Sequence, residues 1–139
     1  MRPLSEEISL PVRFFTPKEA NDLLPKVAPE LLQAAEKVKE LRSLFDSIKN
    51  EAERTAKTEV VERLREQILE HVERIQAQGV EVKGVDQGLL DFPALFRGER
   101  VYLCWQTGET KVSHYHPIAS GYAGRKPIES FEAGWEWRN

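Results

Sequence analysis

The sequence predicts an α+β fold, in which a long antiparallel helical hairpin packs on a small antiparallel β-meander. Apolar residues recur at alternating spacings of three and four along residues 24–48 and again along residues 61–75, as they do on one face of a helix. From Val80 the period changes to two, which is typical of strands with one buried face. With 139 residues, of which 40% are hydrophobic, the chain is expected to form a single domain over residues 1–139.

The first half of the chain predicts the hairpin, over residues 17–78. Thr16-Pro17-Lys18-Glu19 has the pattern of a capping box with proline at the first helical position, so a helix should begin at Pro17. One apolar stripe runs from residue 24 to residue 48 and a second from residue 61 to residue 75. The stripe loses its phase in residues 49–58, which predicts a turn there; because this segment lacks glycine and proline, one continuous helix is the alternative. The surplus stripe on the longer first helix predicts a homodimer.

Residues 80–128 predict the meander and a glycine-rich loop. Arg97-Gly98 and Thr107-Gly108 are suited to two-residue hairpin turns, and the second turn would pair Leu103 with Val112. Since side chains alternate across a sheet, this register places one set of residues on the face toward the helices: Val101, Leu103, Trp105, His114 and His116. Before the helices, residues 8–12 alternate like an edge strand or an extended arm, and residues 129–139 form an aromatic tail.

Composition limits the classes of function. A net charge of -3 disfavours nucleic-acid binding, and no apolar run is long enough to predict a membrane segment or a signal peptide. Cys104, the only cysteine, cannot form an internal disulfide, which favours a cytoplasmic location. Because Cys104 stands between Leu103 and Trp105, we expect a buried, inert thiol.

The histidines predict a metal site as one hypothesis. His114 and His116 project to the same side of a strand, with α-carbons about 7 Å apart. Glu99 lies opposite His116 in the expected register, and His71 interrupts the apolar stripe of the second helix. Three imidazoles with one carboxylate suit a divalent transition metal such as zinc, iron, copper or nickel. The alternative is that the histidines are ordinary hydrogen-bonding groups at the rim of the sheet.

Three segments, GVEVKGVDQGLLDFPAL, GERVYLCWQTGE and GYAGRKPI, contain a set of motif residues: Glu81, Lys83, Asp86, Gly88, Asp91, Phe92, Pro93, Trp105, Gly108, Glu109, His116, Gly121, Gly124 and Arg125. On these residues the chain resembles an uncharacterised bacterial family, the domain of unknown function number 2203. The resemblance covers nearly the whole chain, and its specific part runs from Gly79 to Ile128. This chain departs from the family pattern at Gly84, Tyr115 and Pro117, and neither His71 nor His114 belongs to the motif. The resemblance implies a bacterial cytosolic protein and no particular activity.

Two functions follow from these patterns. The favoured one is a homodimeric binding or assembly module with a small-ligand or anion site on the sheet and the glycine-rich loop, where backbone amides and cations can receive a phosphate or a carboxylate. The residues assigned to this ligand site are Asp91, Trp105, Glu109, His116, Gly121, Gly124 and Arg125. The alternative is a metal-binding protein or a metal-dependent enzyme that uses His116, His114 and a carboxylate, Glu99 or Glu109. The sequence decides neither whether the protein is an enzyme nor what its substrate is.

Overall fold

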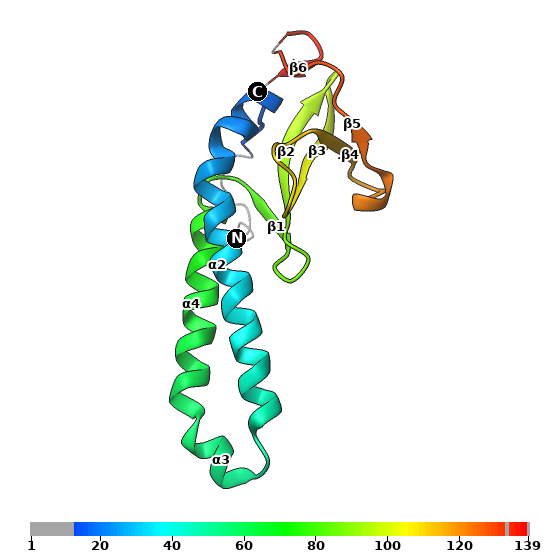
Figure 1. Ribbon diagram of the computed structural model, residues 1–139. Helices are drawn as coiled ribbons and strands as arrows, with labels where there is room; N and C mark the ends of the chain where they lie inside the picture. Colours follow the sequence, from blue (N-terminus) through cyan, green and yellow to red (C-terminus); the bar gives the residue numbers. More distant parts are fainter. Residues whose placement is uncertain (1–12, 133, 139) are drawn as a thin grey trace, which may run out of the picture.

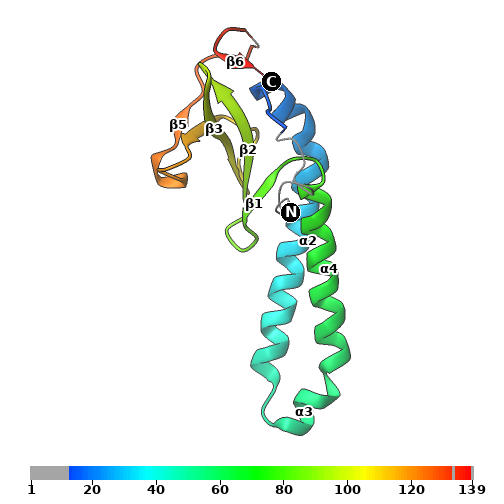
Figure 2. The ribbon, with the colours of Figure 1, turned by 180° about the vertical axis from the view of Figure 1, so that it is seen from behind.

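The computed structural model describes residues 13–132 and 134–138. A long helical hairpin stands beside a sheet, and the end of the hairpin that carries α3 extends beyond the sheet (Figures 1 and 2). The expected α+β architecture is therefore confirmed, with antiparallel strands following the helices. The arm expected in residues 8–12 lies outside the described residues.

The hairpin is built from α2 (Pro17–Ser47) and α4 (Thr58–Gln76). The capping box at the start of α2 is present: Thr16 Oγ1 accepts a hydrogen bond from Glu19 N at 3.2 Å, and Glu19 Oε1 accepts from Thr16 N at 2.9 Å. Between the long helices lies the short helix α3 (Glu51–Ala56), whose N-cap Asn50 accepts from Glu53 N at 2.9 Å. The chain thus reverses within the expected segment, and a continuous helix is excluded.

The first half of α2 is buried beside the sheet, whereas the buried residues of α4 are spread along its length. In α2 the buried residues are Pro17, Ala20, Leu24, Val27, Leu31 and Ala34, and in α4 they are Val61, Leu64, His71 and Ile75. No residue of α2 beyond Ala34 is buried, and Phe45 is 39% exposed. The apolar stripe expected to run to Ile48 is therefore only partly covered within one chain. No helix in the described parts of the chain has both the length and the apolar character needed to cross a bilayer.

The sheet has the strand order β1-β2-β3-β4-β5, with β6 added beside β2, and all described pairings are antiparallel. The strands are β1 (Glu81–Gly84), β2 (Leu89–Phe96), β3 (Glu99–Gln106), β4 (His114–Pro117), β5 (Lys126–Pro127) and β6 (Trp137–Arg138). Arg97 and Gly98 both have positive φ, 51° and 83°, as a type I′ turn requires. This turn pairs Phe96 with Glu99, so the register expected for β2 and β3 is confirmed.

One face of β2 and β3 forms the core with the helices. Phe92, Leu103 and Trp105 belong to the same buried cluster as Leu31 and Ile75 of the hairpin. The C-terminal segment closes one end of this core, because Trp137 is 2% exposed and the centroid of its ring lies 4.6 Å from the ring centroid of Phe96. We call this side the core face, and the opposite side of the sheet the outer face.

The register expected for β3 and β4 is wrong. Leu103 pairs with Tyr115 and not with Val112, so β4 is displaced by three residues. Gly108 has the positive φ of a turn, 104°, but pairing resumes only at His114. The reason is a contact from α2: Asn21 Oδ1 accepts from Val112 N at 2.8 Å, and Asn21 Nδ2 donates to the Val112 carbonyl at 3.0 Å. Val112 is thereby withheld from the sheet, and an odd displacement moves both histidines of β4 to the outer face.

Candidate metal and ligand site

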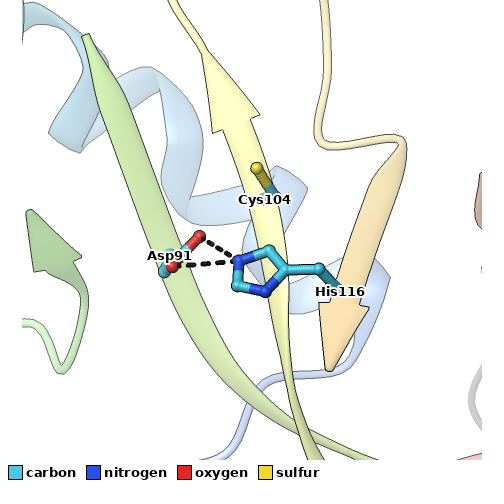
Figure 3. A group of neighbouring side chains, drawn as sticks. All are labelled: Asp91, Cys104 and His116. Carbon is cyan, nitrogen blue, oxygen red and sulfur yellow. Dashed lines mark hydrogen bonds and ion pairs between the residues drawn. The ribbon is translucent and has the colours of Figure 1, made fainter. Parts of the chain in front are cut away.

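Three neighbouring strands each contribute one side chain to a cluster on the outer face: Asp91 from β2, Cys104 from β3 and His116 from β4 (Figure 3). Asp91 is paired directly with Cys104, and His116 is paired with Tyr102, two residues before Cys104. One ligand atom from each of the three lies within 4.8 Å of the others. All three are buried, with exposures of 3%, 1% and 3%. This cluster could hold a metal ion.

The hydrogen bonds of His116 define where its protons lie. Nδ1 is 2.8 Å from the carbonyl oxygen of Pro117, and since a carbonyl can only accept, Nδ1 carries a hydrogen and donates it. Nε2 is 3.1 Å from both carboxylate oxygens of Asp91. A nitrogen and a carboxylate at this distance share one proton, either as an ion pair or as two neutral groups. Burial raises the pKa of the Asp91 carboxyl, and the charge of His116 opposes that rise.

Cys104 is a protonated thiol at neutral pH. Burial, followed by the negative charge of Asp91, raises its pKa to about 12. The expectation of a buried thiol is thus confirmed, and a thiol with so high a pKa is a poor nucleophile. Sequence reasoning nevertheless missed Cys104 as a member of the site. The signal was present, because the confirmed register of β2 and β3 already places Cys104 beside Asp91 on the outer face.

The cluster forms the floor of a cavity of about 370 Å³. This volume falls within the range that holds small molecules. The lining residues are Lys83, Leu89, Asp91, Tyr102, Cys104, His116, Ile118, Gly121 and Tyr122.

Lys83 and Tyr102, which sequence reasoning did not assign to the site, are held in place by Glu81. Lys83 Nζ lies 2.8 Å from Glu81 Oε1 and 4.7 Å from the centroid of the Tyr102 ring. The Tyr102 hydroxyl donates to Glu81 Oε2 at 2.8 Å. The hydrogen bond to Glu81 is the main cause that raises the pKa of Lys83, so the wall of the cavity carries an ammonium group. Lys83 belongs to the family motif, which was the available signal.

The glycine-rich loop is tied to the end of β3 by a second polar group. Arg125 Nη2 donates to both carboxylate oxygens of Glu109, at 3.0 and 2.8 Å, and Arg125 Nη1 donates to the Tyr122 hydroxyl at 2.8 Å. The Tyr122 hydroxyl in turn donates to Gln106 Oε1 at 2.6 Å. These contacts hold Gly121 and Tyr122 as a wall of the cavity. Among the described residues, only Arg125 Nε is a buried side-chain polar atom without a hydrogen-bond partner.

Only some of the residues assigned to the ligand site line the cavity. Asp91, His116 and Gly121 line the cavity. Glu109, Arg125 and Gly124 support the loop that forms its wall: Gly124 N donates to Gly121 O at 3.0 Å, and a Cβ at position 124 would meet Ser120 Oγ at 2.3 Å. Trp105 lies on the core face and donates from Nε1 to the Glu109 carbonyl at 3.0 Å, so it does not reach the cavity.

The expected convergence of three histidines with Glu99 is wrong. His71 is buried between α2 and α4, where Nδ1 lies 2.6 Å from Glu30 Oε1 and Nε2 lies 2.9 Å from Lys37 Nζ. Glu99 is exposed beside the Arg97-Gly98 turn and is paired with Phe96. His114 Nδ1 lies 3.0 Å from Ser113 Oγ and 3.9 Å from Glu109 Oε2. Only His116 of the expected set joins the cluster, because the displacement of β4 turns its side chain away from the helices.

Fold and site together define an α+β protein in which a helical hairpin supports a sheet that carries a buried Asp-Cys-His cluster. The chain belongs to the DUF2203 family, described as an uncharacterized conserved protein, whose match covers residues 13–128. This confirms the resemblance drawn from the motif residues. No curated protein and no solved structure matches the chain.

Proposed function

We propose that this protein binds a divalent transition metal ion through Asp91, Cys104 and His116, and that the ion presents an open coordination position to the cavity. The observation that carries this proposal is the convergence of one carboxylate oxygen, one sulfur and one imidazole nitrogen within 4.8 Å. Bonds of about 2.0–2.3 Å to a tetrahedral ion place ligand atoms roughly 3.3–3.8 Å apart. The nitrogen and the carboxylate oxygens, at 3.1 Å, are already near that separation, so only the sulfur has to move inward, by on the order of 1 Å.

The surroundings of the cluster support the same proposal. A histidine that binds a metal through one ring nitrogen usually donates from the other to a carbonyl or a carboxylate, and His116 Nδ1 donates to the Pro117 carbonyl. Arg125 supplies the second support, because its buried Nε–H has no partner among residues 13–132 and 134–138, and its charge lowers the pKa of Cys104 against the effect of burial. A thiolate formed on metal binding would be stabilised by this cation.

The donor set indicates which ions fit. A thiolate and an imidazole favour zinc, iron, cobalt and similar transition ions, whereas magnesium and calcium prefer oxygen ligands. Three protein ligands leave one tetrahedral position for water or for a bound molecule, as in catalytic zinc sites. At that position an ion can polarise a ligand or lower the pKa of a bound water molecule.

The test is the metal content and spectrum of the protein purified without a histidine tag or a chelator. We expect one equivalent of zinc after dialysis, and with Co²⁺ a thiolate-to-cobalt charge-transfer band in the near ultraviolet. Cys104→Ser should remove that band, and His116→Ala should lower the bound metal to below a tenth of an equivalent. His114→Ala is the matched control, because His114 lies on the same strand outside the cluster. Substoichiometric metal in the folded wild type, or equal binding by Cys104→Ser, would contradict the proposal; circular dichroism establishes that each variant is folded.

We also propose that the protein forms a homodimer through the hairpin. The support is the apolar surface left on the helices, where Phe45 is 39% exposed, Leu32 45% and Leu69 56%. A second copy would cover part of this exposed apolar surface. Light scattering should give twice the monomer mass at micromolar concentration, and Leu69→Glu should shift it to the monomer. A monomeric wild type at these concentrations would rule the dimer out.

A further inference from the structure

We infer that the cavity above the cluster binds a small monocarboxylate with an apolar body, one carboxylate oxygen taking the open position on the ion. This inference rests on the proposed function for that metal bond. Its other parts, a cation and an apolar wall, belong to the protein itself.

The charges around the cavity favour a monoanion over a dianion. The two positive charges of a divalent ion are offset by Asp91 and by the thiolate of Cys104, and His116 is neutral as a ligand. Lys83 then remains as the one cation of the lining, and Glu81, whose Oε1 lies 2.8 Å from Lys83 Nζ, offsets its charge from outside the lining. Its ammonium has three hydrogens, of which one is directed to Glu81, so donors remain for a ligand. A phosphate dianion would leave a buried negative charge without a partner, which is costly.

The lining of the cavity also contains a main-chain donor. Gly121 lines the cavity with φ of 61°, a left-handed conformation that glycine adopts without strain. In the described part of the chain, the Gly121 N–H has no hydrogen-bond partner. A carboxylate bound to the ion has a second oxygen, which can accept a hydrogen bond from Lys83 or from this N–H.

The apolar part of the ligand is inferred from the rim. Ile118 and Tyr122 are among the exposed large hydrophobic residues, at 51% and 39%, and both line this cavity together with Leu89. Exposed apolar side chains gathered around a concave polar site indicate contact with an apolar ligand surface. Tyr102, whose ring packs against the Lys83 ammonium, also lines the cavity and adds aromatic surface to its wall. The ligand class is therefore a short aliphatic or aromatic carboxylic acid.

The experiment titrates cobalt-loaded protein with acetate, propionate, butyrate and benzoate and follows the visible cobalt spectrum. We expect affinity to rise by about fourfold for each added methylene, the factor for burying one CH₂ group. Benzyl alcohol and benzylamine, which lack the carboxylate, should leave the spectrum unchanged. Inorganic phosphate binding more tightly than butyrate, or affinity independent of chain length, would overturn the inference.

Two variants test the walls of the cavity. Lys83→Met should weaken butyrate binding by at least about tenfold, as for a lost charge-assisted hydrogen bond, whereas Lys126→Met, in the same sheet but outside this cavity, should not. Ile118→Ala should flatten the dependence on chain length. Equal affinities in Lys83→Met and Lys126→Met would overturn the inference.

If cobalt fails to load, the metal proposal fails by itself, and the same acids are then titrated into the metal-free protein by ligand-observed NMR. Binding that is lost in Lys83→Met would support the carboxylate site without the ion, and no binding would overturn it.

Discussion

Metal binding at Asp91, Cys104 and His116 should release protons, and their number follows from the geometry. Cys104, with a pKa of about 12, carries its proton throughout the neutral range and must lose it to become a ligand. The proton between His116 Nε2 and Asp91 must also leave when both atoms bind the ion. Each displaced proton raises the affinity about tenfold per pH unit, or about 1.4 kcal/mol. With two protons displaced, wild-type affinity should therefore rise about 100-fold per pH unit near neutrality.

Cys104→Ala isolates the contribution of the thiol. The variant loses one ligand and one displaced proton. Its metal affinity should therefore be weaker, and the slope of the logarithm of that affinity against pH should fall by one. Competition with a chromophoric chelator between about pH 6 and pH 7, corrected for the protonation of the chelator, measures both quantities. Calorimetry in two buffers of different ionisation enthalpy counts the released protons directly. Equal slopes in the two proteins would show that Cys104 is not a ligand.

Three further predictions concern stability. Thr16→Ala removes the N-cap of α2 and should lower the free energy of unfolding by about 1 kcal/mol, seen as a lower urea midpoint with an unchanged m-value. The pKa of Cys104 in the folded protein, about 12, lies above the ordinary value of 9.0. Its contribution to the free energy of unfolding is therefore complete below pH 9 and is lost as pH rises toward 12. Between pH 9 and about pH 10.5 this loss amounts to roughly 2 kcal/mol in metal-free protein, and urea unfolding of Cys104→Ala should lack it. Asn21→Ala leaves the main-chain N–H and carbonyl of Val112 without partners and should cost about 1–3 kcal/mol by the same measurement.

The parts of the fold that local sequence determines were predictable. The capping box at Thr16 needs only residues within one helical turn, and the start of α2 follows from it. The reversal between the long helices followed from the loss of the apolar phase, although no sequence pattern indicated that α3 would form the turn. The Arg97-Gly98 hairpin was predictable because two residues with positive φ determine the pairing of the strands on either side.

The register of β4 could not be predicted in the same way. Thr107-Gly108 has the composition of a two-residue turn, and the strand pattern continues smoothly after it. The turn itself closes, with Glu109 N donating to Gln106 O at 3.0 Å. What prevents the strands from pairing directly after it is Asn21, which lies 91 residues away from Val112 and bonds both of its main-chain polar groups. A contact at that separation depends on how the hairpin docks on the sheet, which no local pattern records. Because the displacement is odd, this one contact reversed the faces assigned to His114 and His116.

The same contact explains why the candidate site was only half predictable. Asp91 and His116 were both identified, but they were assigned to different faces, so their direct contact could not be foreseen. Once β4 is placed correctly, alternation across the sheet brings Asp91, Cys104 and His116 together from three adjacent strands. β2 and β3 are fixed by the core, whereas β4 has four residues, pairs with β3 and β5, and follows a segment that Asn21 holds through Val112.

An ion bound to all three strands would stabilise the weakest of these attachments. Ligand binding to the folded state adds RT ln(1 + [L]/Kd) to stability, about 2.7 kcal/mol when the ligand is at 100 times its Kd. His116 is the only residue of the cluster on β4, so its bond to the ion would be the one that holds β4 in the sheet. Since β4 leads directly into the loop with Gly121 and Tyr122, the same bond would also order the wall of the cavity. Metal binding and ligand binding should therefore be coupled through the position of a single short strand, and the helical hairpin sets that position through Asn21.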